Sequence, residues 1–173
     1  MKYIQVRRHA PKHAEGHLTE EGKRFAEETK KRLPKFNIIL SSDKPRAVET
    51  AKLLTGIMPQ IDKRAGTPAF TLDQEKRLHE LGQNHPFGIA GVIFENQEYK
   101  KMIKEQGQQL STLIEETFSK LPTNGCALII SHDGVMVAAE KILKKAEFGK
   151  ANKTFKPLAG FQVSENGETE DVE

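Results

Sequence analysis

The sequence predicts an α/β fold, a three-layer α/β/α sandwich around a mostly parallel sheet with an antiparallel edge strand. Short apolar, β-prone runs alternate with longer stretches of helical spacing along the chain, which is the pattern of strand–helix units. Residues 127–130 are apolar throughout, as is typical of a central parallel strand covered on both faces. Residues 160–163 alternate like an edge strand. The 173 residues are expected to form a single domain.

The first strand–helix unit is predicted from the N-terminal third of the chain. Residues 3–6 form the strand, and a loop with Pro11 and Gly16 follows it. A helix then extends to residue 33, with acidic residues early and basic residues late, which matches the helix dipole. Thr19 is the expected N-cap of this helix.

The second unit begins with a strand at residues 36–40 and continues into a helix that has Pro45 in its first turn. A third strand is expected at residues 69–72. A long helix is predicted over residues 97–121, weakened or bent at Gly107.

A further helix is predicted over residues 134–145, after the central strand. Residues 165–173 are polar and acidic, so we expect this tail to be frayed.

Composition and charge exclude several classes of function. The net charge is only +3 and the chain has no Trp and two Tyr, so a nucleic-acid surface is not expected. No apolar segment is long enough to cross a membrane and no export signal is evident, so we expect no membrane partner and a cytoplasmic location. The single cysteine, Cys126, fits a buried residue in a reducing compartment.

Two histidines and one arginine each follow the carboxyl end of a predicted strand. They are His9, Arg46 and His132. Ligands of parallel α/β sheets bind beyond the carboxyl ends of the strands, so chain order alone should bring the three side chains to the same edge.

This set of residue types suits phosphoryl transfer. Arginine donates bidentate hydrogen bonds to phosphate oxygens and stays charged, so Arg8 and Arg46 are candidate clamps. A neutral imidazole can attack phosphorus, which makes His9 a candidate nucleophile that needs no metal or other cofactor. A protonated His132 would add a further donor, and a carboxyl group with a raised pKa could protonate the leaving oxygen.

Four motifs in the same order resemble those of the histidine phosphatase superfamily, the phosphoglycerate mutase-like proteins, and in size the chain is similar to their compact phosphatase branch. The resemblance runs from residue 4 to about residue 137. They are Arg8-His9, Leu18-Thr19-Glu20-Glu21-Gly22, the segment Ser41 to Ala51, and Ser131-His132-Asp133-Gly134.

The resemblance implies a catalytic role for each of five residues. His9 would be the nucleophile, Arg8 and Arg46 the phosphate clamps, and His132 the second histidine of the phosphate pocket. Leu78-His79-Glu80-Leu81-Gly82 looks like the segment that carries the family's proton donor, which nominates Glu80, although Asp73 and Glu75 lie close in sequence.

The chain departs from the family pattern at Ala10, where Gly is usual. If the backbone at this position needs a positive φ, the Cβ would cost about 1 kcal/mol or more; otherwise it merely narrows the pocket.

Alternative interpretations remain open. His9, His13 and His17 would line one face of a helix and suggest zinc, but Pro11 argues against that helix, and the last two, with Lys12, could instead form a basic rim. The favoured function is hydrolysis of a phosphorylated small molecule or a phosphoprotein. A phosphoglycerate-mutase-type phosphotransferase and a catalytically weak phosphate-binding protein are the alternatives.

Overall fold

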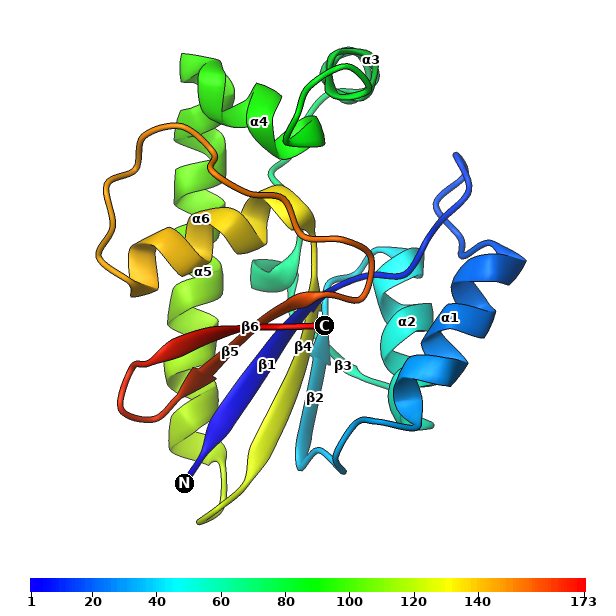
Figure 1. The fold of residues 1–173 in the computed structure, drawn as a ribbon, viewed down its shortest axis with the longest axis vertical. Helices are drawn as coiled ribbons and strands as arrows, with labels where there is room; N and C mark the ends of the chain where they lie inside the picture. The colour runs from blue at the N-terminus through cyan, green and yellow to red at the C-terminus, as the bar shows by residue number, and fades with distance from the viewer.

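A computed structural model describes residues 1–173 as a six-stranded sheet with helices on both faces (Figure 1). The strand order is β3-β2-β4-β1-β5-β6. Parallel pairing joins β1 (Tyr3–Arg8), β2 (Ile38–Ser41), β3 (Gln60–Ile61) and β4 (Cys126–Ser131). Antiparallel pairing adds β5 (Gly160–Ser164) and β6 (Thr169–Val172). The predicted fold class, a mostly parallel sheet with an antiparallel edge, is confirmed.

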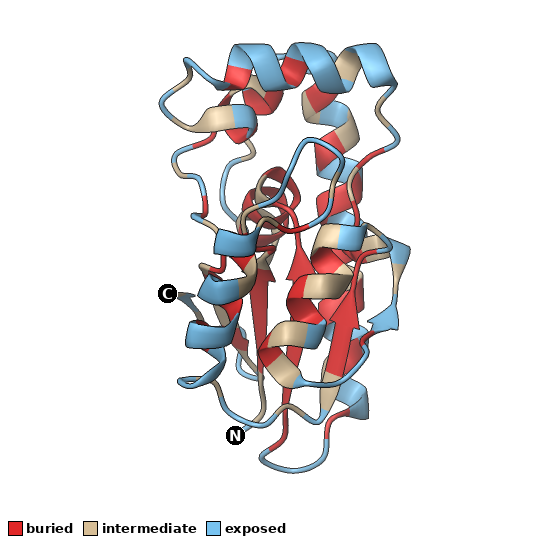
Figure 2. Cartoon of the chain, turned by 90° about the vertical axis from the view of Figure 1, so that its right-hand side faces the viewer, coloured by how far each residue is buried: buried red, intermediate tan, exposed pale blue.

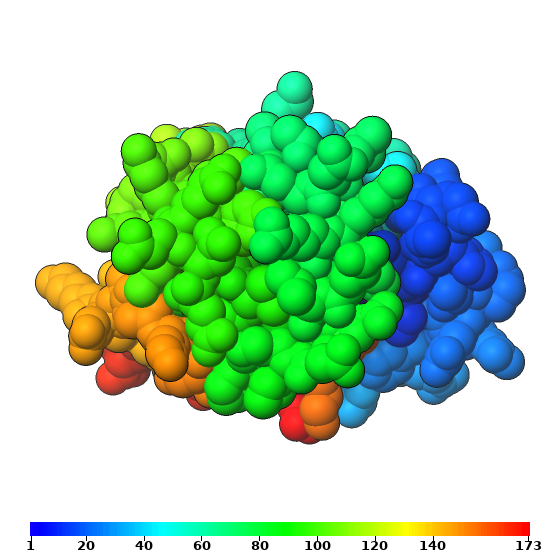
Figure 3. Space-filling model, turned by 90° about the horizontal axis from the view of Figure 1, so that it is seen from above, coloured from blue at the N-terminus to red at the C-terminus, as the bar shows by residue number.

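The helices form two covering layers and a cap. On one face lie α1 (Glu20–Lys30) and α2 (Pro45–Thr55), and on the other lie α5 (Gln97–Lys120) and α6 (Asp133–Leu143). The cap consists of α3 (Leu72–Gly82) and α4 (Gly88–Glu95), and a short 3₁₀ helix, η1 (Lys63–Ala65), precedes it. Seen from above, the green cap segment covers the centre of this end of the molecule, beside the blue N-terminal segment (Figure 3). No helix combines the length and the apolar character that crossing a bilayer would require.

The core is divided by the sheet into two apolar clusters, because side chains of a strand alternate between its faces. In β4, Ala127 and Ile129 belong to the cluster on the α5–α6 side, whereas Leu128 and Ile130 belong to the cluster on the α1–α2 side. Every residue of β4 is buried, and the red strands at the centre of the molecule are visible in Figure 2. The expected central parallel strand is therefore confirmed.

Local signals in the sequence account for the helix that follows β1. Thr19 is the N-cap of α1, and its hydroxyl accepts a hydrogen bond of 2.9 Å from the backbone N–H of Gly22. A Cβ at Gly22 would lie 2.2 Å from the carbonyl oxygen of Pro11, so only glycine lets the loop after β1 pass this close to the helix. The predicted N-cap is confirmed.

The strand expected at residues 69–72 is wrong. Thr71 instead caps α3, and its side chain and that of Gln74 form a capping box. The third strand is β3, which begins nine residues before the expected one, and it occupies the edge of the sheet beside β2. The helix start was overlooked because an apolar pair, Ala69 and Phe70, precedes a capping threonine, and the capping geometry outweighs so short an apolar run.

The frayed tail expected at residues 165–173 is also wrong in part. Residues 169–172 form β6, which pairs with β5 through a turn where Gly167 has a φ of 84°. The antiparallel edge strand is thus β6, and β5 lies between β1 and β6. A polar strand is compatible with a sheet edge that faces water, so polar composition alone did not distinguish it from a frayed end.

The long helix was expected to weaken or bend at Gly107, yet α5 is helical throughout Gln97–Lys120. Gly107 is buried, and a Cβ there would lie 2.6 Å from the Cβ of Ala138 in α6. The glycine therefore allows α5 and α6 to pack closely, and α6 begins next to His132.

Candidate active site

Two imidazoles meet at the carboxyl edge of the sheet. His9 follows β1 and His132 follows β4, and these strands are parallel neighbours in which Arg8 is paired with Ser131. The ring centroids of the two histidines are 5.3 Å apart. His9 is 7% exposed and His132 is 5% exposed, so both rings are largely removed from water.

The guanidinium group of Arg46 bridges the two rings. Its Nε lies 3.2 Å from Nε2 of His9, and its Nη2 lies 3.3 Å from Nδ1 of His132. Arg46 is in the first turn of α2, directly after Pro45. Because β2 delivers this helix to the same edge of the sheet, residues from three separate segments converge on one site.

The hydrogen bonds around His9 determine which of its ring nitrogens carries the hydrogen. Nδ1 is 2.8 Å from the carbonyl oxygen of Ala10, which can only accept, so Nδ1 carries the hydrogen. Nε2 then has a free lone pair, which accepts from Arg46. Burial lowers the pKa of His9 to about 3, and the positive charges of Arg46 and Arg8 act in the same direction. His9 is therefore a neutral imidazole near pH 7.

His132 is neutral for the same reason. Burial lowers its pKa well below the ordinary value for histidine, and the nearby charge of Arg46 adds to this effect. Arg46 donates to Nδ1, so the single ring proton is on Nε2, which lies 2.8 Å from the hydroxyl oxygen of Ser42. Ser42 thereby orients His132.

Arg8 is held by the segment that follows α6. Its Nη1 donates to the carbonyl oxygen of Phe155 at 2.5 Å and lies 3.8 Å from a carboxylate oxygen of Asp133. Asp133 also accepts a 2.6 Å hydrogen bond from the backbone N–H of Phe155. Burial raises the pKa of Asp133, and the positive charge of Arg8 partly offsets that rise. The Nε of Arg8 is buried with no hydrogen-bond partner in the protein.

Ala10 adopts no strained conformation, because it is not among the residues with positive φ. Its methyl group belongs to the apolar cluster on the α1–α2 side of the sheet, and its backbone N–H donates to the hydroxyl of Thr50 at 3.0 Å. The same hydroxyl donates to the carbonyl oxygen of Arg46 at 2.6 Å. Alanine is thus compatible with this loop and is packed in the core.

Glu80, the nominated proton donor, is not brought to the two imidazoles. It lies in α3, is exposed, and forms no hydrogen bond or ion pair. The sequence did not predict the helix that carries it.

The three histidines spaced by four residues do not come together either. His9 is buried in the site, His13 is exposed, and His17 pairs with Glu49 of α2. Lys12 is close enough to the site for the charges of Arg46 and Arg8 to help burial lower the pKa of its ammonium group. Of the proposed basic rim, Lys12 is the member that shares the electrostatic environment of the site.

Sequence reasoning assigned no role to four residues that support the site. Three of them lie within the segment Ser41 to Ala51, so their position in that motif was the available signal. They are Ser42, Glu49 and Thr50, and the fourth is Asp133. Glu49 accepts from the backbone N–H of Leu18 at 2.9 Å and so fastens the loop after β1 to α2. No sequence signal pointed to Phe155.

Solved structures with a similar fold include phosphatases and a mutase. A mycobacterial glucosyl-3-phosphoglycerate phosphatase complexed with inorganic phosphate has a TM-score of 0.72 at 18% identity, with 100% of this chain and 96% of that chain covered. A mutant phosphoserine phosphatase from Entamoeba histolytica, in complex with phosphoserine, has a TM-score of 0.72 at 16% identity, with coverage of 100% and 96%. A phosphoglycerate mutase from Bacillus anthracis has a TM-score of 0.65 at 15% identity, with coverage of 98% and 91%.

At these identities the likeness shows a shared fold. A search of curated protein sequences finds no match. The family model for the histidine phosphatase superfamily (branch 1), however, matches residues 5–165. Because that match covers most of the chain, from within β1 to the end of β5, the chain belongs to the histidine phosphatase superfamily.

Proposed function

We propose that the protein is a metal-independent phosphatase that hydrolyses a phosphomonoester through a phosphohistidine intermediate on His9. The observation that carries this proposal is the state of His9, a buried neutral ring with the lone pair of Nε2 facing the guanidinium of Arg46. A nucleophile in this state needs no base to remove a proton before it attacks.

In the first step Nε2 of His9 attacks phosphorus, the N–P bond forms and the bond to the leaving oxygen breaks. Arg46 gives up its hydrogen bond to Nε2 and turns its N–H groups toward the phosphoryl oxygens, where negative charge spreads in the transition state. The unpartnered Nε of Arg8 supplies another donor. The proton on Nδ1, shared with the carbonyl of Ala10, stabilises the positive charge that the ring acquires.

In the second step water attacks phosphorus and the N–P bond breaks, which returns His9 to its neutral form. A carboxyl group that has protonated the leaving oxygen in the first step takes the proton from this water. A phosphate dianion next to His132 opposes the effect of burial and raises the pKa of that ring, so His132 takes up a proton when phosphate binds and becomes a donor.

A phosphorylated small molecule is the substrate class that the similar folds favour, since the solved phosphatases among them act on phosphoserine and glucosyl-3-phosphoglycerate. A phosphoprotein is the second possibility for the same chemistry. We place the reaction in the cytosol, where a buried, unpaired cysteine such as Cys126 stays reduced.

The test is turnover of p-nitrophenyl phosphate by wild type and by His9→Ala, with and without chelator. We expect wild type to be active in chelator, the variant to lose at least about 10³-fold in kcat, and an acid-labile, base-stable phosphoenzyme to form on wild type alone. Activity that survives the substitution but disappears with chelator would overturn the mechanism.

Phosphatase and mutase differ in the acceptor of the phosphoryl group. Labelled phosphate should pass from the enzyme to water even when phosphoglycerate is present. Transfer to phosphoglycerate in preference to water would instead identify a phosphotransferase of the mutase type, and a stable phosphate complex with no turnover would identify a binding protein.

A further inference from the structure

The proposed mechanism needs a carboxyl group, and α3 offers acidic residues that face different directions. Leu78 is 3% exposed and Gly82 is buried, and together they define the inner face of this helix. Glu75 precedes them by three and seven residues, spacings that return to the same face. At 3.6 residues per turn, Glu80 lies about 140° around the helix from Glu75.

Asp73 is on the outer side as well. Two residues before Glu75, it lies about 160° around the helix from it. All three carboxylates of the segment are exposed, but Glu75 alone lies on the side of α3 that carries Leu78 and Gly82.

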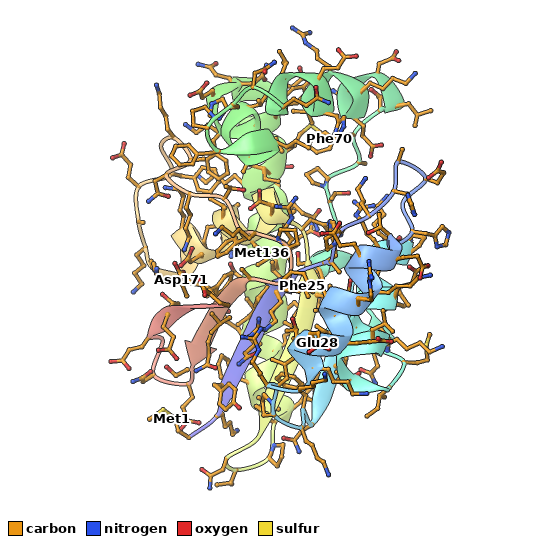
Figure 4. The ribbon with its side chains drawn as sticks, turned by 45° about the vertical axis from the view of Figure 1, so that its right-hand side comes forward. Met1, Phe25, Glu28, Phe70, Met136 and Asp171 are labelled. Carbon is orange, nitrogen blue, oxygen red and sulfur yellow. The ribbon has the colours of Figure 1, made fainter.

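Side-chain contacts anchor the start of α3, next to Glu75. The capping box of Thr71 and Gln74 fixes the first turn, and the Gln74 side chain donates to Glu98 of α5 at 3.2 Å. Just before the helix, Phe70 packs edge-on against Tyr99 with ring centroids 5.8 Å apart. Phe70 lies between α3 and the rest of the molecule in Figure 4. These contacts set the rotation of α3 and hence the direction of Glu75.

The negative charge of Glu75 also influences the pKa values of two basic groups at the site. Burial lowers the pKa of Arg46, and the negative charge of Glu75 is the opposing influence that raises it. Glu75 likewise raises the pKa of Lys12, which burial and Arg46 lower. Of the acidic residues of α3, Glu75 is the one whose charge contributes to both shifts. Glu75 is therefore within interaction range of the guanidinium that contacts both imidazoles.

We propose that Glu75, rather than Glu80, is the general acid and base of the reaction, an inference that rests on the proposed phosphatase function. Its carboxyl proton passes to the leaving oxygen as the N–P bond to His9 forms. The resulting carboxylate then accepts a proton from the water that attacks the phosphohistidine. The two transfers cancel, so each cycle returns Glu75 to its protonated form.

The test compares leaving groups in Glu75→Gln. An alkyl phosphate such as glycerol phosphate has a leaving oxygen that must be protonated, whereas nitrophenolate leaves readily without a proton. We expect the variant to lose about 10²-fold or more in kcat/KM for glycerol phosphate and less than about tenfold for p-nitrophenyl phosphate. Glu75→Asp, which keeps a carboxyl group, should recover part of the activity toward the alkyl substrate.

Glu80→Gln and Asp73→Asn are the matched controls, because each removes one carboxylate from the same helix. Both should remain within about twofold of wild type on either substrate. An equal loss on both substrates in Glu75→Gln would overturn the inference, and so would a leaving-group-selective loss in Glu80→Gln. These outcomes are distinct from failure of the proposed function, which would appear as a wild type that forms no phosphoenzyme.

Discussion

The cluster of His9, Arg46 and His132 at the sheet edge and the cap above it are built in different ways. The imidazoles of His9 and His132 stand at the ends of neighbouring strands, are almost fully buried, and share the guanidinium of Arg46. The cap instead leaves large apolar side chains in water, with Leu72 77% exposed and Leu81 49% exposed. The first region is determined by strand order, and the second by the rotation of a helix.

This difference separates two tasks of the proposed enzyme. Binding and attack on the phosphoryl group depend on residues that the sheet fixes, so they should tolerate little change. Protonation of the leaving group depends on the cap, where substitutions alter fewer buried contacts. Variants in the two regions should therefore differ in the property they disturb.

The largest expected effect is on the stability of the buried region in acid. The folded-state pKa of His9, about 3, is below the unfolded value of 6.5, so the unfolded chain binds the proton more readily. The stability contributed by neutral His9 is fully present above pH 6.5 and is lost as the pH falls toward 3. The slope reaches about 1.4 kcal/mol per pH unit.

Urea unfolding of wild type and His9→Asn between pH 7 and pH 4 measures this dependence. The variant should show a shallower loss of stability, while His13→Asn, a change at an exposed histidine, should keep the slope of wild type. Equal slopes in wild type and His9→Asn would show that this imidazole is not held neutral.

Replacing the bridging guanidinium by an ammonium should have the next largest effect. Arg46→Lys keeps the charge but loses the planar set of donors that reaches both rings, so kcat/KM for p-nitrophenyl phosphate should fall about 10²-fold. Lys52→Arg, at an exposed position in the same helix, is the control and should leave the rate unchanged. A loss below about threefold in Arg46→Lys would mean that charge alone suffices.

Close packing beneath the site should be disturbed by Gly107→Ala. Helix propensity alone predicts stabilisation of about 1 kcal/mol, but the new methyl group would lie 2.6 Å from Ala138. We expect a net destabilisation of about 1–3 kcal/mol in chemical unfolding. A stabilised variant would show that α5 and α6 can separate without cost.

The smallest effect is expected in the cap. Thr71→Ala removes the capping box of α3, at a cost of about 1 kcal/mol to that helix. Hydrogen exchange of the α3 amides should accelerate, while exchange in β4 should stay unchanged. Acceleration in both would indicate that the cap and the sheet unfold as one unit, so that the two regions do not differ in local stability.

The sequence was sufficient to predict the sheet and which residues meet at its carboxyl edge. The apolar run at residues 127–130, the Thr19 N-cap and the mostly parallel sheet all depend on local patterns, and the structure confirms them. The meeting of His9, Arg46 and His132 followed from the rule that parallel strands end at one edge. How these residues act on a substrate remains a proposal.

The cap could not be predicted in the same way, because its geometry depends on helical phase and on tertiary anchors. Glu80 and Glu75 are the same residue type, so the sequence does not distinguish them as candidates. Only the burial of Leu78 shows which side of α3 faces inward. The contact of Arg8 with Phe155 joins residues 147 positions apart, and no local pattern carries that information. Nor did composition distinguish a pairing strand from a loose end at residues 169–172.

The central place of β1 has a consequence for biosynthesis. Tyr3 pairs with Cys126 on one side and with Ser164 on the other, so β1 can complete its pairing only after both of these later segments have been made. His9 has no neighbouring ring until His132 has been made, and Arg8 has no carbonyl to hold it until Phe155 has been made. A chain that stops before these residues would therefore lack a complete site, and β1 would be left with unpaired edges that favour aggregation.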